Sequence, residues 1–279
     1  MVVSGFTIVR NAIKYNYPVL ESIRSILPIC DEFVVNVGKS EDDTLGMIKS
    51  LNSPKIRIIE TQWDFSKGNI ELSSQTNIAL KQCAGDWAFY LQSDELVHEA
   101  DLPKLRRCME QCLNKDVDAL RFAWLHFYGS YYRYRIDSGW YQKQDRIVRN
   151  NGTVRSMGDA YGFERSDGAP LRRRHTGCFL YHYGWVQPQE VMTERRVNAE
   201  MMGITTLKED EKTVAYSYGD LNRFPVYYGS HPSQIKERVA SHELSQRDWQ
   251  DIKQRQVLNP FVYLRPRYKT PFRIKEKIN

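Results

Sequence analysis

The chain has 279 residues, 41% of them hydrophobic and 12% aromatic, which is enough for one large packed domain with an appendage. Residues 253–279 carry a charge of +7 out of a net charge of +6, so the rest of the chain sums to −1 and does not resemble a nucleic-acid-binding protein. No apolar run approaches the ~20 residues that span a bilayer, and the first residues lack a signal-peptide pattern, so we expect a cytoplasmic protein. The five cysteines include no CxxC pair, which favours buried thiols over disulfides or zinc ligands.

Strands and helices alternate along the first 114 residues. Short apolar runs predict strands over 6–9, 33–37, 57–60 and 87–90. Apolar residues at helical spacing predict helices from Pro18 to about residue 27 and over about 45–51, 71–83 and 100–114. This alternation predicts an α/β fold with a mainly parallel sheet flanked by helices.

An acidic turn follows the fourth predicted strand. The segment Leu91-Gln92-Ser93-Asp94-Glu95 comes directly after the apolar run over 87–90. Open α/β sheets bind their ligands at the carboxyl ends of the strands, so these two carboxylates are expected at a ligand site. The alternative is an acidic turn that only caps the next helix.

The loop after the first predicted strand carries no known phosphate-binding motif. Arg10-Asn11-Ala12-Ile13-Lys14 is neither the Gly-x-Gly-x-x-Gly of a dinucleotide-binding fold nor a P-loop. It also lacks the glycine- and basic-rich loop expected of a sugar nucleotidyltransferase. That enzyme class is kept as an alternative because it too places acids after such a strand.

The second predicted strand and its turn, over residues 34–44, resemble a segment of family 2 of the glycosyltransferases, which have the GT-A fold. The family pattern is a strand followed by Asp-Asp-Gly-Ser-x-Asp-Gly-Thr. The positions that match are Ser40, Asp42 and Thr44. Val37 and Gly38 replace the acidic pair of the pattern.

Two more segments resemble the same family. Residues 75–79 are similar to the helix start Ala-Arg-Asn-x-Gly and retain Asn77 but not the arginine. Residues 85–95 are similar to Gly-Glu-Tyr-hydrophobic-Leu-Asp-x-Asp-Asp, with Gln92 in place of the first aspartate. The resemblance is clear over about residues 5–98, and it implies a GT-A fold.

The resemblance implies a nucleotide-sugar donor and a divalent cation, Mg²⁺ or Mn²⁺, at the acidic turn. Asp94 is the expected metal ligand, and Glu95 is expected to support it or to bind the donor sugar. Gln92 offers only a neutral oxygen, so we expect it at ribose or sugar hydroxyls and expect a weaker need for metal. The other residues expected around the nucleotide are Arg10, Asn11, Ser40, Asp42 and Asn77.

The second half of the chain is expected to supply the acceptor side. In inverting GT-A enzymes a carboxylate beyond the metal motif is commonly the general base, and a later histidine completes the metal or diphosphate site. Asp159 and His182 occur in this order. The alternatives are an Asx-turn residue and a core histidine, respectively. Further candidates are Asp137, Asp145 and Glu164 for the base and His231 for the metal or diphosphate.

We therefore divide the chain into a GT-A-like domain over 1–185, a helical region over 186–252 and a basic, aromatic tail over 253–279. The expected activity is inverting transfer of a sugar from a nucleoside-diphosphate donor, with a UDP-sugar favoured, to a hydroxyl of a glycan or lipid-linked acceptor. A catalytically silent nucleotide- or glycan-binding protein is the alternative outside the enzymes. The tail suits peripheral binding to an anionic membrane, or else it folds back on the body. Aromatic residues over 124–135 and 140–141 are expected in the core or stacked on a sugar.

Overall fold

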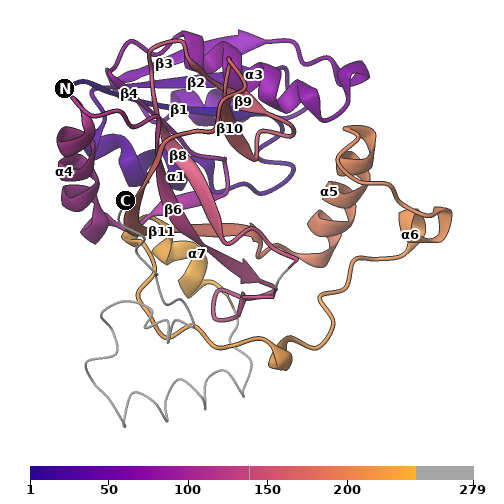
Figure 1. Ribbon diagram of the computed structural model, residues 1–279. Helices are drawn as coiled ribbons and strands as arrows, with labels where there is room; N and C mark the ends of the chain where they lie inside the picture. Colours follow the sequence, from indigo (N-terminus) through magenta and orange to yellow (C-terminus); the bar gives the residue numbers. More distant parts are fainter. Residues whose placement is uncertain (138, 243–279) are drawn as a thin grey trace.

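The computed structural model describes residues 1–137 and 139–242 (Figure 1). The tail over 253–279, with its predicted membrane role, lies outside these residues. Within them, nine strands form one sheet in the order β3-β2-β1-β4-β8-β6-β11-β5, with β7 paired to β6. The strands of this sheet are β1 (Val3–Val9), β2 (Glu32–Gly38), β3 (Ile56–Thr61), β4 (Trp87–Tyr90), β5 (Glu95–Val97), β6 (Ala119–Tyr128), β7 (Tyr134–Arg135), β8 (Lys143–Arg149) and β11 (Arg173–Trp185).

The sheet has a parallel part and a mixed part. Strands β3, β2, β1 and β4 run parallel and carry the segments in which strands and helices alternate. Strand β8 joins β4 in antiparallel orientation and also pairs with β6. Strand β11 is parallel to β6 and antiparallel to β5, so β5 is hydrogen-bonded to the rest of the sheet through β11. The predicted α/β fold with a helix-flanked sheet is confirmed.

Helices cover both faces of the parallel part. In β2, Phe33 and Val35 face a core shared with α1 and α4, whereas Val34 faces a second core shared with α3, as the alternation of a strand requires. The helices of this half are α1 (Val19–Ile26), α2 (Thr44–Lys49), α3 (Ile70–Lys81) and α4 (Leu102–Cys112). Each matches a predicted helix to within a few residues.

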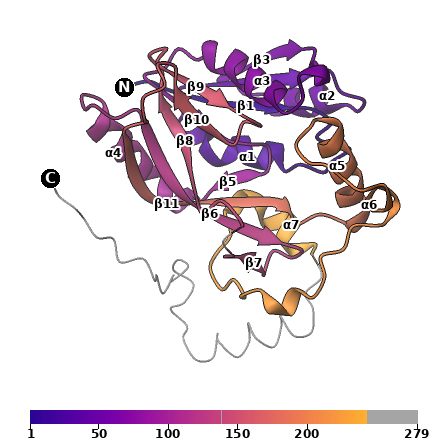
Figure 2. The same cartoon turned by 45° about the vertical axis from the view of Figure 1, so that its right-hand side comes forward.

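The later segments add a hairpin and three helices. The hairpin consists of β9 (Val154–Met157) and β10 (Gly162–Arg165), and it packs against α3 and β8. The helices are α5 (Gln189–Met201), α6 (Glu209–Thr213) and α7 (Lys236–Ala240). Figure 2 shows α5 and α6 beside the sheet and α7 below β11. No helix of residues 1–137 and 139–242 is long and apolar enough to cross a membrane.

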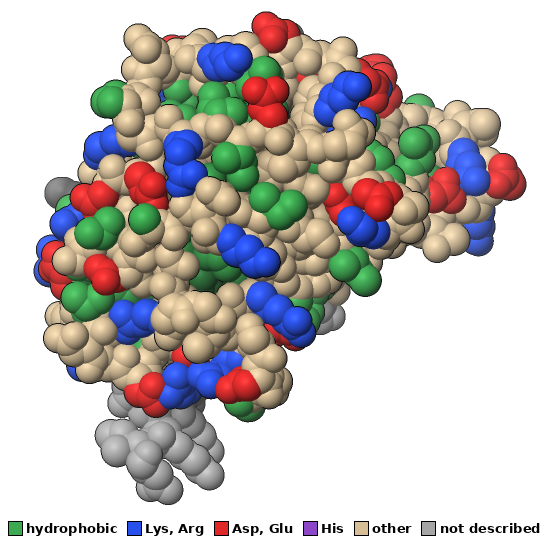
Figure 3. Space-filling model, turned by 90° about the horizontal axis from the view of Figure 1, so that it is seen from above, with side chains coloured by type: hydrophobic (Ala, Val, Ile, Leu, Met, Phe, Trp, Pro, Cys, Tyr) green, Lys and Arg blue, Asp and Glu red, His purple; other side chains and the backbone are tan. Residues whose placement is uncertain are grey.

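The surface and the thiols agree with the composition. Basic and acidic side chains are interspersed on the face seen in Figure 3, as expected of a body that is near neutral before residue 253. All five cysteines are buried free thiols, which confirms that prediction. Burial raises the pKa of the Cys178 thiol to about 12, so this thiol is uncharged at neutral pH.

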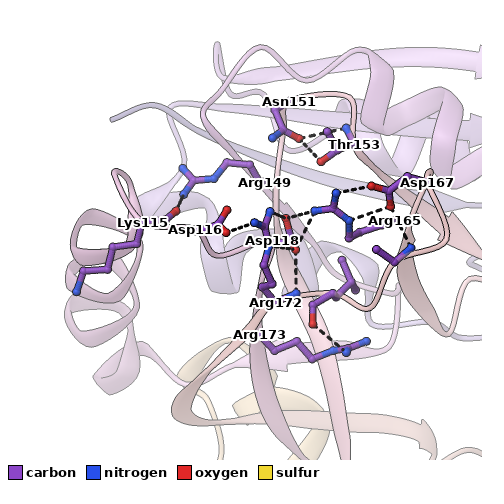
Figure 4. A network of polar contacts seen from close by, with 12 residues as sticks. Lys115, Asp116, Asp118, Arg149, Asn151, Thr153, Arg165, Asp167, Arg172 and Arg173 are labelled. Carbon is purple, nitrogen blue, oxygen red and sulfur yellow. Dashed lines mark hydrogen bonds and ion pairs between the residues drawn. The ribbon is translucent and has the colours of Figure 1, made fainter. Parts of the chain in front are cut away.

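A polar network fastens β10 and the start of β11 to the segment before β6 (Figure 4). Its centre is Asp118, which is 1% exposed. Arg172 donates to both carboxylate oxygens of Asp118 at 2.7 and 2.8 Å, and its backbone N–H donates at 2.8 Å. Arg165 adds a contact of 3.2 Å. The hydrogen bonds from Arg172 hold the pKa of Asp118 well below its usual range.

Candidate functional site

A cleft of about 180 Å³ opens at the carboxyl ends of β1 and β4. It lies where the acidic turn was expected, at the edge of the sheet at which parallel strands end. Its walls come from the end of β1 with the loop after it, the turn after β4, the turn between β9 and β10, the segment from α5 to Ile204, and the side chains of Trp63 and Leu72. The side chains that line it are Ile8, Val9, Arg10, Tyr15, Tyr17, Trp63, Leu72, Tyr90, Gln92, Ser93, Asp94, Asp159, Ala160, Asn198, Met202 and Ile204.

The acidic turn is fixed to the neighbouring strand by hydrogen bonds. Ser93 Oγ donates to Ile8 O at 2.9 Å, and Thr7 Oγ1 donates to Leu91 O at 2.7 Å. The Gln92 backbone N–H donates to Glu95 Oε2 at 3.0 Å. The turn is therefore held at both ends, and Asp94 lies at a defined place on the wall of the cleft.

Asp94 is 8% exposed and lies beside two nitrogen-bearing side chains. Its Oδ2 is 3.7 Å from His182 Nε2 and 3.4 Å from Arg195 Nη2. Burial raises the pKa of Asp94, but the neighbouring His182 and Arg195 outweigh burial and lower the pKa to about 2. Asp94 is therefore an anion at neutral pH.

Gly184 allows this close approach. A Cβ at this position would lie 2.5 Å from Asp94 Oδ2 and 2.7 Å from His182 Nε2, inside the van der Waals distance of both atoms. Any larger residue would separate the two side chains. The glycine that follows His182 by two positions in β11 is therefore part of the site.

A second histidine orients His182. His126 on β6 is paired with His182 on β11, and their Nδ1 atoms are 2.9 Å apart. His126 Nε2 is 2.6 Å from Tyr141 O, which can only accept, so His126 Nε2 carries a hydrogen. Burial and the neighbouring His182 lower the pKa of His126 to about 3, so the ring is neutral and its Nδ1 accepts from His182 Nδ1. His182 Nε2 is then the atom that faces Asp94.

Asp94 Oδ2 and His182 Nε2 fit a divalent cation that takes its remaining ligands from a substrate. Mg²⁺ and Mn²⁺ are commonly held by one or two protein carboxylates together with substrate phosphates and water. A separation of 3.7 Å leaves room for an ion between the two atoms. The described residues contain no group of three or more His, Cys, Asp or Glu that could hold a metal by itself. The protein thus offers a partial set of ligands.

Glu95, which is expected to support Asp94 or to bind the donor sugar, does not line the cleft among the described residues. It is fully buried, and Arg146 donates to its two carboxylate oxygens at 2.7 and 2.9 Å. Arg146 is fully buried as well and donates to Tyr161 O at 3.0 Å. The two oxygens therefore face the interior, where the ion pair ties the acidic turn to β8 and β10.

Asp159 lies in the turn between β9 and β10 and lines the cleft together with Asp94. Gln92 Nε2 donates to Ala160 O at 3.3 Å, which joins the turn after β4 to the turn between β9 and β10. Gly158 has a φ of 58°, and Ala160, with a φ of 61°, adopts the same left-handed conformation without being glycine. A strained turn of this kind places the Asp159 carboxylate at the cleft.

The other three candidate bases lie elsewhere. Asp145 is held by Arg121 at 2.8 Å and Arg173 at 2.9 Å. Asp137 pairs with Arg135, and Glu164 pairs with Arg155 at 2.9 Å. None of the three lines the cleft among the residues that the structure describes. Of the four carboxylates, Asp159 is the one in position to meet a ligand there.

The residues expected at the nucleotide divide into lining and supporting groups. Arg10 and Gln92 line the cleft. Asn11, which is fully buried, accepts from the Glu41 N–H at 2.8 Å, and Ser40 Oγ accepts from the Asn11 N–H at 3.0 Å. These contacts join the loop after β1 to the turn after β2.

Two more of the expected residues also form protein contacts. Asp42 accepts from the Lys14 N–H at 2.7 Å and so holds the loop after β1. Asn77 accepts from the Ser156 N–H at 2.7 Å and donates to Ser156 O at 3.1 Å. Asn77 therefore fastens the hairpin that carries Asp159.

His231 and most of the aromatic residues over 124–135 and 140–141 lie in the core. His231 Nδ1 lies 2.9 Å from Tyr183 Oη inside an aromatic cluster and does not line the cleft. Trp124 is 7% exposed, whereas Tyr141 is 56% exposed. The Tyr141 ring stacks on Tyr161 with centroids 5.5 Å apart and planes 2° apart. Tyr141 and Tyr161 thus form a ring pair close to the turn of Asp159.

Three site residues were missed by sequence reasoning: His126, Arg146 and Arg195. Arg146 had no local signal, because β8 is mostly polar and its sequence does not show which of its charged residues is buried. His126 belongs to an aromatic strand, and its pairing with His182 depends on the register of β6 and β11. Arg195 lies on a helix of mixed composition, whose contact with Asp94 spans 101 residues.

Comparisons with known proteins gave a family match and a set of similar solved structures. The model of the family "Glycosyl transferase family 2" matches residues 6–187. Among solved structures, S. aureus TarS 1-349 in complex with UDP-GlcNAc is 17% identical, with a TM-score of 0.43, over 76% of this chain and 69% of that one. Glucosyl-3-phosphoglycerate synthase from Mycobacterium tuberculosis, in complex with Mn²⁺, UDP and phosphoglyceric acid, is 19% identical, with a TM-score of 0.32, over 44% and 43% of the two chains. The comparison with curated proteins found no match.

Proposed function

The chain belongs to glycosyltransferase family 2, whose model spans residues 6–187, and we propose that it transfers a sugar from a UDP-sugar to a hydroxyl with inversion at the anomeric carbon. The observation that supports this proposal is the cleft that Asp94 and Asp159 share at the carboxyl ends of β1 and β4. Asp94 lies beside His182 and Arg195, and Asp159 lies on the turn between β9 and β10. Inverting transfer needs these two functions, a stabilised leaving group and a base.

The reaction is a single displacement. The acceptor oxygen forms a bond to the anomeric carbon while its proton passes to an Asp159 carboxylate oxygen. The bond from that carbon to the donor phosphate breaks, and its electron pair remains on the departing phosphate oxygen. Because Asp159 lies in a turn held by Asn77 and Gln92, its carboxylate is positioned before the substrates bind.

Asp94 Oδ2 and His182 Nε2 are the atoms that would hold a divalent cation. When bound, Mg²⁺ or Mn²⁺ would neutralise charge on the departing diphosphate. Asp94 is already an anion because His182 and Arg195 lower its pKa to about 2. His126 fixes the His182 ring so that Nε2 faces the carboxylate.

A glycan, lipid-linked or otherwise, is the acceptor in this proposal. The ring pair of Tyr141 and Tyr161 supports it, because the C–H faces of pyranose sugars pack well on aromatic rings. Tyr141 is 56% exposed, so part of its ring is accessible to a ligand. Tyr141→Ala should raise the KM for the acceptor and leave donor binding unchanged.

Thermal unfolding with a panel of nucleotide sugars tests the donor. A ligand at 100 times its dissociation constant stabilises the folded state by about 2.7 kcal/mol. We expect UDP and UDP-sugars to raise the Tm, and Mn²⁺ to increase that shift. No response to any nucleotide would contradict the proposed function, and release of pyrophosphate from a nucleoside triphosphate would indicate nucleotidyl transfer instead.

Binding to membranes is a separate part of the proposal and concerns the basic tail over 253–279. Clustered cations near an anionic bilayer contribute on the order of 1 kcal/mol each, and salt weakens them. The full chain should sediment with anionic liposomes at low salt more than a chain ending at Gln254. Equal sedimentation of the two chains would remove the membrane role.

A further inference from the structure

Arg195 brings a guanidinium to the acidic turn from a distant helix. It lies on α5, and its Nη2 is 3.4 Å from Asp94 Oδ2. Its Nη1 donates to Gly184 O, and its guanidinium carbon lies 4.6 Å from the centre of the Tyr17 ring. The side chain is 17% exposed, so it is held by protein contacts yet open on one side.

The face of α5 that carries Arg195 is the face that borders the cleft. Asn198 and Met202 follow Arg195 by three and seven positions, which places all three on one side of a helix. Asn198 and Met202 line the cleft, as do Asp94 and Tyr17, the two side chains that Arg195 contacts. Arg195 is not itself one of the lining residues, but its guanidinium contacts two side chains that are, so it lies at the border of the cleft beside Asp94.

The charges around the turn leave Arg195 available to an anion. Glu95 is neutralised by Arg146 at 2.7 Å, and Gln92 is uncharged, so Asp94 is the one carboxylate of the turn that Arg195 faces. The contact of 3.4 Å is longer than the 2.7–2.9 Å of a strong charge-assisted hydrogen bond. Asp94 thus attracts Arg195 but makes only a long contact with it. Glu95, in contrast, accepts two short hydrogen bonds from Arg146.

We propose that Arg195 is a catalytic residue that binds the β-phosphate of the donor diphosphate and stabilises the negative charge left on it during transfer. This inference rests on the proposed function. The bond from the anomeric carbon to the β-phosphate oxygen breaks, its electron pair stays on that oxygen, and Arg195 remains protonated and donates hydrogen bonds to it. A planar guanidinium binds phosphate oxygens in pairs, which suits this position better than an ammonium group. Because this cation belongs to the protein, binding of UDP does not depend wholly on metal.

Calorimetric titration of the full chain with UDP and with UMP, in EDTA and in Mn²⁺, tests this role. The variants are Arg195→Gln, which removes the charge, and Arg195→Lys, which keeps it. Arg107→Gln is the matched control, because Arg107 is exposed on α4 and loses the same charge outside the cleft. Thermal unfolding without ligand shows whether each variant is folded.

In EDTA, Arg195→Gln should bind UDP roughly 10- to 100-fold more weakly than the wild type, the size expected for lost hydrogen bonds to a charged group. Its affinity for UMP, which lacks the β-phosphate, should change less than about three-fold, and Arg195→Lys should recover part of the UDP affinity. Equal losses for UDP and UMP, or no loss for either, would overturn the role of Arg195 while leaving the proposed function in place. If Arg195→Gln does not fold, the same comparison is made with Arg195→Lys against Arg107→Gln, where an unchanged ratio of UDP to UMP affinity overturns it. A wild type that binds no nucleotide would overturn the proposed function, and the inference with it.

Discussion

The clusters around Asp94 and Asp118 contain similar residues but are built differently. Each is a buried aspartate with two basic side chains. At Asp118, Arg172 contributes three hydrogen bonds of 2.7–2.8 Å. At Asp94, the nearest nitrogens of His182 and Arg195 are 3.7 and 3.4 Å away. The first cluster is satisfied within the protein, whereas the second keeps its charges close together with room for a further group between them.

This difference indicates that the Asp118 cluster stabilises the fold, whereas the Asp94 cluster serves function. A carboxylate whose hydrogen bonds are complete holds elements together, and removal of its charge leaves its arginines without their partner. A carboxylate whose partners stand apart contributes less to folding and can accept a ligand. Three substitutions and a pH series can confirm or contradict this comparison.

The largest effect is expected from Asp159→Asn. The amide keeps the size and hydrogen bonding of the side chain but cannot take a proton, so sugar transfer should fall by ~10²–10⁴-fold. UDP affinity, measured by calorimetry, should stay within about two-fold. Glu164→Gln is the matched control on the same hairpin and should transfer normally. Normal transfer by Asp159→Asn would move the base elsewhere.

Asp94→Asn should lower the rate of UDP release from a UDP-sugar at least ~10²-fold in Mn²⁺, because it removes the anionic ligand of the proposed metal site. The Tm should fall by less than that of Asp118→Asn, since the neighbouring nitrogens are not in close hydrogen-bond contact with this carboxylate. Both quantities are measured on the same preparation. A variant that turns over normally would show that Asp94 does not serve the metal.

Asp118→Asn should lower the stability of the protein and leave its turnover nearly unchanged, the reverse of the result expected for Asp94→Asn. Loss of the charged hydrogen bonds from Arg172 and Arg165 should lower the free energy of unfolding by roughly 1.5–3 kcal/mol, or about 3–12 °C in Tm. The turnover of the folded variant should remain within about two-fold of the wild type, because the network lies away from the cleft residues. A lower turnover with an unchanged Tm would show that Asp118 serves function rather than stability.

The smallest effect is expected in how the free energy of unfolding falls at acid pH. The folded-state pKa of Asp94 is about 2, that of Asp118 is also well below the ordinary value near 3.9, and both carboxylates bind protons more readily when unfolded. Their contribution is therefore complete above about pH 4 and is lost as the pH falls toward 2, by at most about 1.4 kcal/mol per pH unit for each group. Urea unfolding between pH 5 and 2.5 should give a shallower slope for Asp118→Asn than for the wild type. An identical slope would show that Asp118 is not a strong ion pair in solution.

The parallel half of the sheet was predictable from the sequence because its information is local. Apolar runs, helical spacing and the acidic turn each lie within about a dozen residues, and they placed β1 to β4 and the Asp94 turn correctly. The mixed half depends on pairings between distant strands. No local pattern shows that β8 inserts between β4 and β6, or that β11 carries His182 to His126.

Individual residues show the same limit. Asp94 and Glu95 are neighbours in one acidic motif, yet Asp94 lines the cleft and Glu95 is buried against Arg146. Composition does not distinguish them, because the direction of each side chain follows from how the turn enters β5. Asn77 matched a family position and was expected at the nucleotide, but its amide holds the hairpin of Asp159. His231 was a candidate for the metal or diphosphate and lies in the aromatic core instead.

The pairing of β5 with β11 has a consequence for synthesis of the chain. Strand β5 follows the Asp94 turn directly, but its hydrogen-bonded partner begins at Arg173 and ends at Trp185. Chains emerge from the ribosome N-terminus first, so the nascent chain displays the acidic turn long before β11 or α5 has been made. Until then the edge of β5 is open and Asp94 lacks both His182 and Arg195. The parallel half can collapse early, whereas a complete cleft can form only after about a hundred further residues have been translated.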